Sequence, residues 1–296
     1  MSRVVVVSKR SSYNRYVVEE NDAHVRALIK RRDPVVKRWR RADDDHRQSL
    51  EEVERVLDRL GVHYVLVRNP NAQFDPVDAD LVVTVGGDGT MLAASHNVTD
   101  VPLLGVNSAP RSSVGFFCAG RASTVKRLIP RALDGVLESV TLQRMQVTVN
   151  GRVRSKRVLN DALFCHASPA ATSRYILKHR RLQEEQRSSG LWVGPAAGST
   201  AAIHSAGGRV LTLTSRRLQV VVREPYAAFG KAYRLLRFAI EPGQQATAKS
   251  KMNDAFMFLD GPYKTVRVCL GDEVAFSLSD EPLTVLGLNA LRTKAR

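Results

Sequence analysis

The stretch from Leu81 to Thr90, LVVTVGGDGT, decides how the rest of the chain is interpreted. Four of its first five residues are apolar, which is typical of a buried strand in a parallel sheet. The strand ends in the glycine loop Gly86-Gly87-Asp88-Gly89-Thr90, and residues 91–96 then have a helical composition. A strand, a glycine turn and a helix N-terminus together favour phosphate, because free N–H groups and the helix dipole attract an anion.

Asp88 is the unusual residue of this loop, because a carboxylate repels phosphate. A carboxylate is expected in a phosphoryl-transfer site, because it can orient the attacking hydroxyl and accept its proton. The alternative is a tight turn in which Asp88 only caps the helix. The chain has no GxxxxGK[ST] motif, and Leu92 stands where the dinucleotide fingerprint has glycine. A nucleotide site here is therefore of another type.

Length and composition indicate an ordinary globular protein. The chain has 296 residues, 44% hydrophobic and 25% charged, enough for two domains. No apolar run approaches the roughly 18 residues of a membrane span, and MSRVVVVSKR begins a strand without a targeting peptide. Cys118, Cys165 and Cys269 are far apart and form no CxxC motif. We therefore predict reduced thiols in the cytoplasm, with no structural zinc and no membrane association.

The net charge of +16 predicts polyanionic partners. The charge is spread over several segments: residues 26–41 hold eight Lys or Arg against one acid, and residues 152–187 hold nine against three. Nucleic acid and small polyanionic substrates both fit this excess. Aromatic residues are only 6%, and no basic strand carries the aromatic residues typical of RNA-binding sheets. We therefore expect solvated basic faces and no nucleic-acid partner.

Up to residue 138 the chain alternates strands with amphipathic helices, which predicts an α/β domain with a parallel sheet and ligands at the carboxyl ends of its strands. Residues 11–48 are charged and weakly periodic, and predict an irregular helix pair or a partly mobile excursion. Lys9 and Arg10 are either a polar strand end or a phosphate contact. The predicted strands are 4–7, 62–67, 81–85 and 103–106, and the predicted helices are 49–60, 91–96 and 122–137.

From residue 139 to about 279 the hydrophobic period drops to two and helices become scarce, which predicts a β-rich, β-sandwich-like domain. Residues 280–296 contain a late apolar strand that we expect to return to the α/β domain of residues 1–138. The predicted strands of this part are 140–149, 152–164, 191–193, 210–213, 219–223, 255–259, 265–270 and 283–288.

Two stretches of the β-rich part have a composition suited to binding. Asn160 and Asp161 are adjacent polar residues at a predicted strand end, which indicates either a bulge or recognition of ribose or adenine. Residues 188–208, SSGLWVGPAAGSTAAIHSAGG, are small enough for a ligand to lie against the backbone. Within them, Gly198-Ser199-Thr200 suits a turn entering a helix, a geometry that favours anions. The alternative is a mobile glycine-rich loop.

Three motifs in this order resemble the NAD kinase family: GGDGT at 86–90, LND at 159–161, and GST-A at 198–201 followed by SAGG at 205–208. The glycine loop alone is shared with lipid kinases, but the three motifs together are specific. LLGVN at 103–107, RSSGL at 187–191 and AAGSTAA at 196–202 look most like the plant-type NADH kinase branch. The resemblance spans most of the chain, from Val4 to the late strand.

The resemblance implies transfer of the γ-phosphoryl of ATP, or in some members of the family a phosphoryl group of polyphosphate, to the 2′-hydroxyl of the adenosine ribose of NAD⁺ or NADH. Which donor this chain prefers stays open at this point. It makes Asp88 the catalytic residue that orients and deprotonates this hydroxyl. It implies Mg²⁺ arriving with ATP, without a protein ligand, and NAD(H) binding by residues 139–279. The loop residues implied to hold phosphate are Gly86, Gly87, Gly89 and Thr90. The residues implied to bind NAD(H) are Phe117, Asn160, Asp161, Thr200, Ala201 and Ser205.

The chain departs from the family pattern near the nicotinamide. Ser189-Gly190 replaces the family's Asp-Gly, and Ala202 replaces a tyrosine. Loss of the acid removes a Coulomb preference for the cationic oxidised ring, so we predict that NADH is accepted at least as well as NAD⁺. The alternative is that Glu184 or Glu185 takes over the role of that acid.

Sheet surface without covering helices, together with assembly of the family through this domain, predicts a homo-oligomer, a dimer or larger. Two rival functions remain at this point. A lipid kinase shares the glycine loop, but usually carries Asn-Glu soon after it, where this chain has Met91 to His96. A non-enzymatic basic protein would bind DNA or RNA in a salt-sensitive way.

Overall fold

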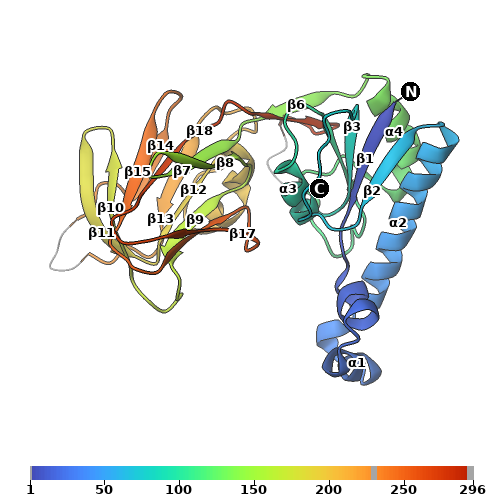
Figure 1. Ribbon diagram of the computed structural model, residues 1–296, viewed down its shortest axis with the longest axis horizontal. Helices are drawn as coiled ribbons and strands as arrows, with labels where there is room; N and C mark the ends of the chain where they lie inside the picture. The colour runs from blue at the N-terminus through green and yellow to red at the C-terminus, as the bar shows by residue number, and fades with distance from the viewer. Residues whose placement is uncertain (1, 228–231, 292–296) are drawn as a thin grey trace. The chain divides into compact units, whose positions relative to one another are not determined.

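The computed structural model describes residues 2–227 and 232–291, and its chain forms two compact units (Figure 1). Unit 1 comprises the residues up to Val140 together with Thr284–Asn289, and unit 2 comprises Thr141–Leu283. The predicted class, an α/β domain followed by a β-rich sandwich-like domain, is confirmed. Within the described residues, no helix is both long enough and apolar enough to cross a membrane.

Unit 1 is built on a seven-stranded sheet, counted over the described residues, with the order β2-β1-β3-β4-β19-β6 and β5 paired to β4. The pairs of β1 with β2 and β3, and of β4 with β3 and β19, are parallel. The sheet's strands are β1 (Arg3–Ser8), β2 (His63–Val67), β3 (Leu81–Gly86), β4 (Leu103–Asn107), β5 (Gly120–Arg121), β6 (Ser139–Leu142) and β19 (Leu283–Leu286).

Helices cover both faces of this sheet: α2 and α4 lie on one face and α3 on the other (Figure 1). Buried valines of β1 and β3 pack with apolar residues of α2 and α4 in one core cluster. The helices are α1 (Ala23–Lys30), α2 (Trp39–Arg59), α3 (Asp88–Ser95) and α4 (Val125–Leu133). The short helical turns are η1 (Asn14–Glu19), η2 (Pro34–Val36) and η3 (Ala122–Thr124).

The order of the sheet fixes where a ligand site is expected. The chain passes from β1 to β2 on one side and then returns to β3 on the other side of β1. The connections therefore diverge between the carboxyl ends of β1 and β3, which is the usual place for a ligand in open α/β sheets. Lys9 and Gly86 stand at these two ends, and the Lys9 N–H donates to the Val85 carbonyl at 3.1 Å.

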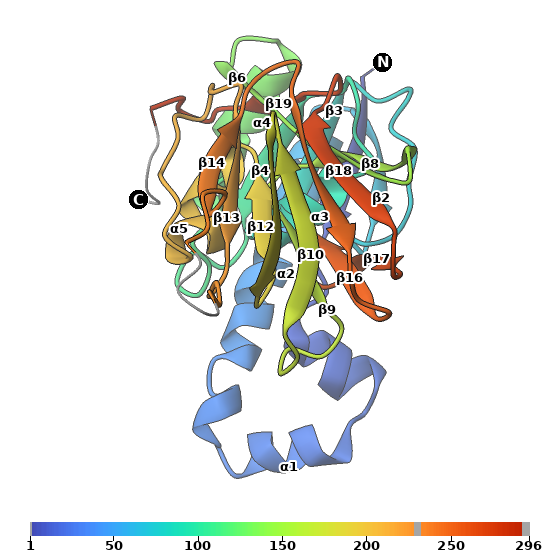
Figure 2. The ribbon, with the colours of Figure 1, turned by 90° about the vertical axis from the view of Figure 1, so that its left-hand side faces the viewer.

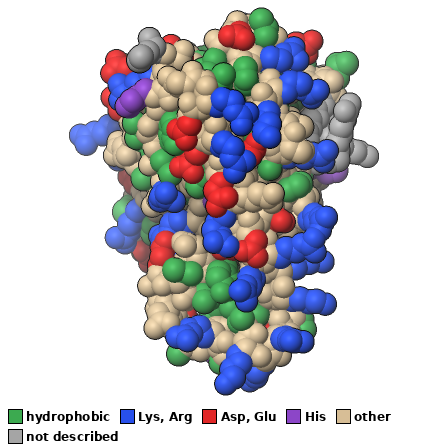
Figure 3. All heavy atoms as spheres, turned by 90° about the vertical axis from the view of Figure 1, so that its right-hand side faces the viewer, with side chains coloured by type: hydrophobic (Ala, Val, Ile, Leu, Met, Phe, Trp, Pro, Cys, Tyr) green, Lys and Arg blue, Asp and Glu red, His purple; other side chains and the backbone are tan. Residues whose placement is uncertain are grey.

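The charged stretch 11–48 forms a helical excursion of η1, α1 and η2, which runs away from the sheet before α2 returns (Figures 1 and 2). The prediction of a helix over 49–60 was too short, since α2 begins at Trp39. Its first turns bury the polar residues Asp43, His46 and Ser49 where an amphipathic helix would show apolar ones. Lys and Arg side chains surround a hydrophobic patch at the end of this face where α1 lies (Figure 3).

Unit 2 contains two antiparallel sheets, each six-stranded within the described residues (Figure 2). Sheet B has the order β11-β10-β15-β18-β7-β8, and sheet C has the order β14-β13-β12-β9-β16-β17. Sheet B comprises β7 (Met145–Val149), β8 (Arg152–Val158), β10 (Ser173–His179), β11 (Leu182–Ser188), β15 (Gln245–Ser250) and β18 (Glu273–Leu278). Sheet C comprises β9 (Ala162–His166), β12 (Leu191–Gly194), β13 (Leu218–Val222), β14 (Arg237–Ile240), β16 (Ala255–Leu259) and β17 (Lys264–Val268).

One hydrophobic core joins the inner faces of sheets B and C. Phe164 of sheet C meets Tyr175 of sheet B edge-to-face, with ring centroids 5.8 Å apart. The Tyr175 hydroxyl lies 2.8 Å from the Ser188 hydroxyl, so the buried phenol is satisfied. Two short helical segments, η4 (Ala196–Thr200) and α5 (Ala202–Ser205), pack against β12 and β13 of sheet C.

Two predicted strands of unit 2 proved to be broken. Arg144 interrupts the predicted strand 140–149; it is fully buried and its Nη2 donates to the Pro282 carbonyl at 3.2 Å. The predicted strand 152–164 is interrupted at residues 159–161 by the turn described below. In both places the strand pairing is interrupted where a residue forms hydrogen bonds with a segment distant in sequence: Arg144 with Pro282, and the 159–161 turn with Asp260.

Other strand predictions were wrong or incomplete. Residues 210–213 form no strand, because the Leu211 N–H donates to the Ser199 hydroxyl at 2.9 Å. The hairpin β10–β11 was missed, as were β14, β15 and β18. In β11 two of the buried, inward-facing positions hold the polar residues Gln186 and Ser188. The strand therefore shows no alternation of apolar and polar residues in the sequence.

The late apolar strand does join unit 1: β19 lies beside β4, with Val285 paired to Leu103. Residues 292–296, the end of the predicted returning segment, lie outside the described residues. Cys118, Cys165 and Cys269 are free thiols.

Candidate active site

The glycine loop packs tightly between β3 and α3. A Cβ on Gly86 would lie 2.1 Å from Thr90 Oγ1, and one on Gly87 would lie 2.3 Å from Ser113 Oγ. A Cβ on Gly89 would meet nothing within 4 Å. Gly86 and Gly87 are therefore required by the protein's own packing, whereas the backbone at Gly89 is open to an approaching group. Of the first N–H groups of α3, that of Thr90 donates to the Gly87 carbonyl at 3.0 Å, so those of Asp88 and Gly89 are the ones placed to meet an anion.

Asp88 is held by two backbone donors from a different segment. Its Oδ2 accepts the Phe116 N–H and its Oδ1 accepts the Phe117 N–H, both at 2.9 Å. Gly87 occupies the N-cap of α3 and Asp88 lies in the first turn, so Asp88 does not cap the helix. Two bonds fix the orientation of the carboxylate, and each oxygen still has a lone pair for a further proton or donor.

Phe117 is a core residue in this conformation. It exposes 2% of its surface and meets Phe116 edge-to-face, with ring centroids 5.1 Å apart. Its N–H holds Asp88, so the position is coupled to the glycine loop through its backbone. A contact between the Phe117 ring and a substrate ring remains a prediction.

In unit 2, one carboxylate organises the Asn160–Asp161 turn. Asp260 accepts the N–H groups of Leu159, Asn160 and Asp161 at 2.9, 2.6 and 3.2 Å. The Asp260 N–H in turn donates to the Asp161 carbonyl at 2.9 Å. Asp260 was not among the predicted site residues. The sequence signal for Asp260 was an Asp-Gly pair directly after a predicted strand. In the structure Asp260 follows β16 and adopts the left-handed region, at φ 52°.

The second motif of unit 2 packs directly on this turn. A Cβ on Gly198 would lie 1.7 Å from the Asn160 carbonyl oxygen, and one on Gly194 would lie 2.3 Å from it. The fold thus brings the LND and GST motifs into contact through their backbones. Asn160, Thr200 and Ala201 are partly exposed and Ser205 is exposed. These four side chains are therefore accessible to a ligand at the turn and the following short helix.

Asp161 differs from its neighbours because it is buried, with 7% of its surface exposed. Burial, with the nearby charge of Asp260 second, raises the pKa of Asp161 from its ordinary value to about 7. The carboxyl therefore changes between hydrogen-bond donor and acceptor near neutral pH. Either form suits a ribose hydroxyl, which both donates and accepts.

A second polar cluster, at the carboxyl end of β1, was missed by the sequence analysis. The Ser8 hydroxyl lies 3.1 Å from His46 Nε2, and the Ser11 hydroxyl donates to the Asp43 carboxylate. Burial lowers the pKa of Lys9, against the raising effect of Asp43 and Asp45. Burial first, and the Lys9 charge second, lower the pKa of His46 to about 4, so this imidazole is neutral at pH 7. The cluster fixes α2 against the edge where ligands are expected.

Near the position where the family has Asp-Gly, Ser189 lines a hollow of about 300 Å³ together with Cys165, Arg223 and Glu224. The two acids considered as substitutes are engaged elsewhere. Glu184 accepts the Arg234 and Leu235 N–H groups at 2.8 and 3.0 Å. Glu185 pairs with Lys251.

Across residues 2–227 and 232–291, no group of three or more His, Cys, Asp and Glu side chains is placed to hold a metal ion. Asp88 directs both oxygens at backbone N–H groups. These side chains therefore do not form a protein cage for a divalent cation.

Fold and site together define a class of protein. An open α/β sheet with a glycine loop and a fixed acid at its switch point, followed by a two-sheet β unit, is the arrangement of a nucleotide-using kinase. Comparison with known proteins narrows this class. The family model for the ATP-NAD kinase N-terminal domain matches residues 6–137.

Relatives extend the match over most of the chain. A probable NADH kinase from Oryza sativa subsp. japonica is 34% identical over 261 residues, covering 80% of each chain. An NADH kinase from Arabidopsis thaliana is 32% identical over 265 residues, covering 80% of this chain and 82% of the relative. The chain belongs to the NAD kinase family.

A solved structure has the same fold. An NAD kinase from Archaeoglobus fulgidus in complex with ATP aligns with a TM-score of 0.67 over 96% of this chain and 93% of the other. Identity with that chain is 20%, so the comparison speaks for the fold alone.

Proposed function

We propose that this protein is an NAD(H) kinase, which transfers the γ-phosphoryl of ATP to the 2′-hydroxyl of the adenosine ribose of NAD⁺ or NADH and gives NADP(H). The observation that carries the proposal is Asp88, a carboxylate fixed by two N–H donors at the start of α3. Membership of the NAD kinase family supports the substrate class. Its relatives from Oryza and Arabidopsis, named as NADH kinases, support activity on the reduced nucleotide as well.

In the proposed reaction Asp88 orients the 2′-hydroxyl and accepts its proton as the oxygen attacks the γ-phosphorus. The bond from the γ-phosphorus to the β–γ bridging oxygen breaks, and ADP leaves with that oxygen. Gly86, Gly87, Gly89 and Thr90 would hold the phosphoryl group at the N-terminus of α3, where the backbone at Gly89 is open and would neutralise developing charge on its oxygens. The transition state of phosphoryl transfer is loose, so positioning and charge neutralisation matter more than a strong base. A carboxylate with two fixed oxygens suits this role because its geometry is set before the substrate arrives.

Unit 2 would hold the adenosine half of NAD(H). Asn160 and Asp161 would bind the ribose, and Thr200, Ala201 and Ser205 would line the adenine pocket. Contact between the two motifs, through Gly198 and the Asn160 carbonyl, supports one shared pocket for these residues. Phe117 would contribute through its backbone N–H, which holds Asp88, because its ring is buried in this conformation.

Mg²⁺ is proposed as the companion ion of ATP, held by phosphate oxygens, because Mg²⁺ usually reaches phosphoryl-transfer sites bound to the phosphates of the donor. It would supply charge neutralisation on the phosphates. A cytoplasmic location is also proposed, supported by three free cysteines.

The proposal is tested by incubating the purified protein with ATP, Mg²⁺ and either NAD⁺ or NADH, and measuring NADP(H) with an NADP-specific dehydrogenase. We expect product with both acceptors. Diacylglycerol and sphingosine, offered in place of NAD(H), test the lipid-kinase alternative. Phosphorylation of a lipid without formation of NADP(H) would overturn the proposal, as would salt-sensitive DNA binding combined with indifference to nucleotides.

Acceptance of NADH at least as well as NAD⁺ remains a prediction. Engagement of Glu184 and Glu185 by other partners supports it, because neither is free to replace the missing acid at Ser189. Glu224 shares the Ser189 hollow, but Arg223 lines the same hollow and offsets its charge. Comparing kcat/KM for the two nucleotides checks the prediction, and Ser189→Asp should shift selectivity toward NAD⁺. A strong preference for NAD⁺ in the unmodified protein would contradict it.

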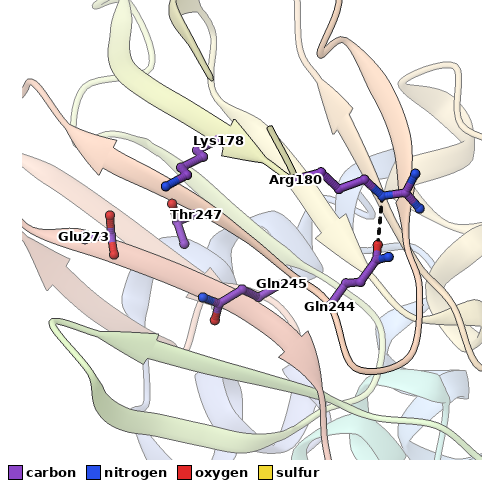
Figure 4. Close-up of a pocket in the computed structure, with 6 residues that line it drawn as sticks. All are labelled: Lys178, Arg180, Gln244, Gln245, Thr247 and Glu273. Atoms are coloured by element: carbon purple, nitrogen blue, oxygen red, sulfur yellow. Dashed lines mark hydrogen bonds between the residues drawn. The ribbon is translucent and has the colours of Figure 1, made fainter. Parts of the chain in front are cut away.

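Assembly into a homo-oligomer through the outer face of sheet B completes the proposal. Within the described residues the helical segments of unit 2 pack on sheet C, and none covers this face. Lys178, Thr247 and Glu273 of three neighbouring strands line a hollow of about 330 Å³ on it, beside a hydrogen bond of 3.1 Å from Arg180 to Gln244 (Figure 4). The edge strand β8 carries Arg and Lys side chains, which disfavour edge-to-edge pairing.

A further inference from the structure

The beginning of α2 and the loop after β4 enclose a basic hollow in unit 1. Its volume is about 240 Å³. Two of its arginines come from the helical excursion, one helical turn apart, and the third comes from the loop. The six residues that line this arginine hollow are Arg38, Arg41, Ala42, Asp45, Arg111 and Ser112.

The helical wall of the arginine hollow is fixed in place. Tyr16 stacks on Trp39, with ring centroids 5.7 Å apart, and so ties η1 to the first residue of α2. One turn further on, Asp43 accepts from Ser11 and His46 contacts Ser8. These contacts hold the first turns of α2 against the carboxyl end of β1.

The loop wall of the arginine hollow lies against the glycine loop. The Ser108 N–H donates to the Gly86 carbonyl at 3.0 Å. The Ser113 hydroxyl packs so closely on Gly87 that a Cβ there would lie 2.3 Å from it. Ser112 and Arg111 therefore lie one and two residues before Ser113, which is in contact with the glycine loop.

The charge of the arginine hollow is unbalanced. Three arginines and one acid, Asp45, are among the residues that line it. The neighbouring acids Asp43 and Asp44 are paired with Arg47, which is outside the hollow. Guanidinium groups bind phosphate through parallel N–H bonds, so three of them around one hollow match a chain of phosphates better than a single anion.

We propose that the arginine hollow binds condensed phosphate, as the outer part of the donor's phosphate tail beyond the glycine loop. The excursion of residues 11–48 thereby contributes Arg38 and Arg41 to donor binding. This inference rests on the proposed function for the identity of the donor. The binding chemistry itself, three guanidiniums around a polyphosphate, stands without it.

Inorganic tripolyphosphate is the probe, because it carries the tail without the nucleoside. Its affinity for the full-length protein is measured by isothermal titration calorimetry, for the unmodified chain and for Arg41→Gln and Arg111→Gln. Each variant should bind about tenfold more weakly, the expected loss for one charge-assisted phosphate contact. In the kinase assay the KM for ATP should rise by a similar factor, with kcat and the KM for NAD(H) kept.

Arg40→Gln is the matched control. Arg40 is the neighbour of Arg41 in sequence, but it lines a separate groove with Ile29 and Val36. The control removes the same charge, so it should leave tripolyphosphate affinity within about twofold of the unmodified protein. Equal weakening in Arg40→Gln and Arg41→Gln would show a diffuse effect of net charge and would overturn the proposal. Unchanged affinity in both Arg41→Gln and Arg111→Gln would also overturn it.

Two readouts separate this inference from the proposed function. Loss of tripolyphosphate affinity in Arg41→Gln and Arg111→Gln, in a protein that makes no NADP(H), would keep the hollow and reject the function. Kinase activity in the unmodified protein, with tripolyphosphate affinity unaltered in both variants, would keep the proposed function and reject the hollow as a phosphate site. Weaker tripolyphosphate binding with an unchanged KM for ATP would assign the hollow to free condensed phosphate and refute its role in ATP binding.

Discussion

At the scale of single residues, Asp88 has a structural role, because it accepts two backbone N–H groups, and we propose a catalytic one beside it. Asp88→Asn should lower turnover at least about a hundredfold, the range for loss of a general base. The amide keeps one acceptor oxygen and presents N–H₂ to the other backbone donor, so Phe116 or Phe117 loses its partner. We expect a loss of about 1–3 kcal/mol of stability as well. Steady-state kinetics and calorimetry measure the two effects.

The matched control for Asp88 is Asp100→Asn, an exposed carboxylate before β4. It should change neither turnover nor melting temperature. Near-normal turnover in a folded Asp88→Asn variant would remove Asp88 from the mechanism.

Asp161 should make the protein less stable as pH rises. Its folded pKa of about 7 lies above the ordinary value of 3.8, so the folded state holds a proton that the unfolded state has released. The stabilisation from this proton is fully present below the unfolded pKa of 3.8. It is lost as pH rises through that value toward the folded pKa of about 7, and the free energy of unfolding falls by on the order of 4 kcal/mol in total. Asp161→Asn cannot ionise and should lose less stability between pH 5 and pH 8.

Melting temperatures at these two pH values check this expectation. The difference between variant and unmodified protein cancels other titrating groups, including His46. Asp254→Asn, an exposed carboxylate of the same unit, serves as control. Parallel curves for Asp161→Asn and the unmodified chain would place the pKa of Asp161 near its ordinary value.

At the scale of elements, the packing of η4 on the Asn160–Asp161 turn should be intolerant of one extra carbon. Gly198→Ala would place its Cβ 1.7 Å from the Asn160 carbonyl oxygen, so the turn or the helix must move. We expect a loss above the 1–3 kcal/mol typical of overpacking and a higher KM for NAD(H). Thermal unfolding and the kinase assay measure these changes.

Gly243→Ala is the comparison for Gly198→Ala. It has free space around its Cβ and carries only the strain of a left-handed φ of 78°. It should cost about 1 kcal/mol and leave KM unchanged. If the melting temperature of Gly198→Ala equals or exceeds that of Gly243→Ala, the Asn160–Asp161 turn moves aside without loss of stability, which would contradict this prediction.

At the scale of the whole molecule, the proposed assembly depends on the outer face of sheet B. Thr247→Arg places a long cation in the middle of that face, where Thr247 exposes only 9% of its surface. A long charged side chain in an interface costs desolvation and holds the partner sheet away, so the variant should dissociate to monomers. Light scattering coupled to gel filtration measures the mass. Tyr263→Arg, an exposed position between β16 and β17 of sheet C, should leave the oligomer intact.

The contrary result for Thr247→Arg is a mass equal to that of the unmodified oligomer, which would move the interface elsewhere. A monomer in the unmodified protein at working concentration would reject the assembly.

The sequence by itself determined the features that depend on near neighbours. An apolar run before three glycines predicted β3 and a helix after it, and the change of hydrophobic period predicted a β-rich part after an α/β part. Three motifs with their spacing indicated the family and the reaction. These signals are local because strand and helix periodicity, glycine conformation and turn chemistry act over a few residues.

Only the tertiary structure decided which distant groups meet. Asp88 is held by N–H groups 28 and 29 residues away, and the Asn160 turn by Asp260, about a hundred residues away. The first half of α2 and strand β11 escaped prediction because they bury polar side chains, such as Asp43 and Gln186, that form hydrogen bonds with residues distant in sequence. A buried polar residue leaves no hydrophobic period in the sequence, since its partner is supplied by the fold.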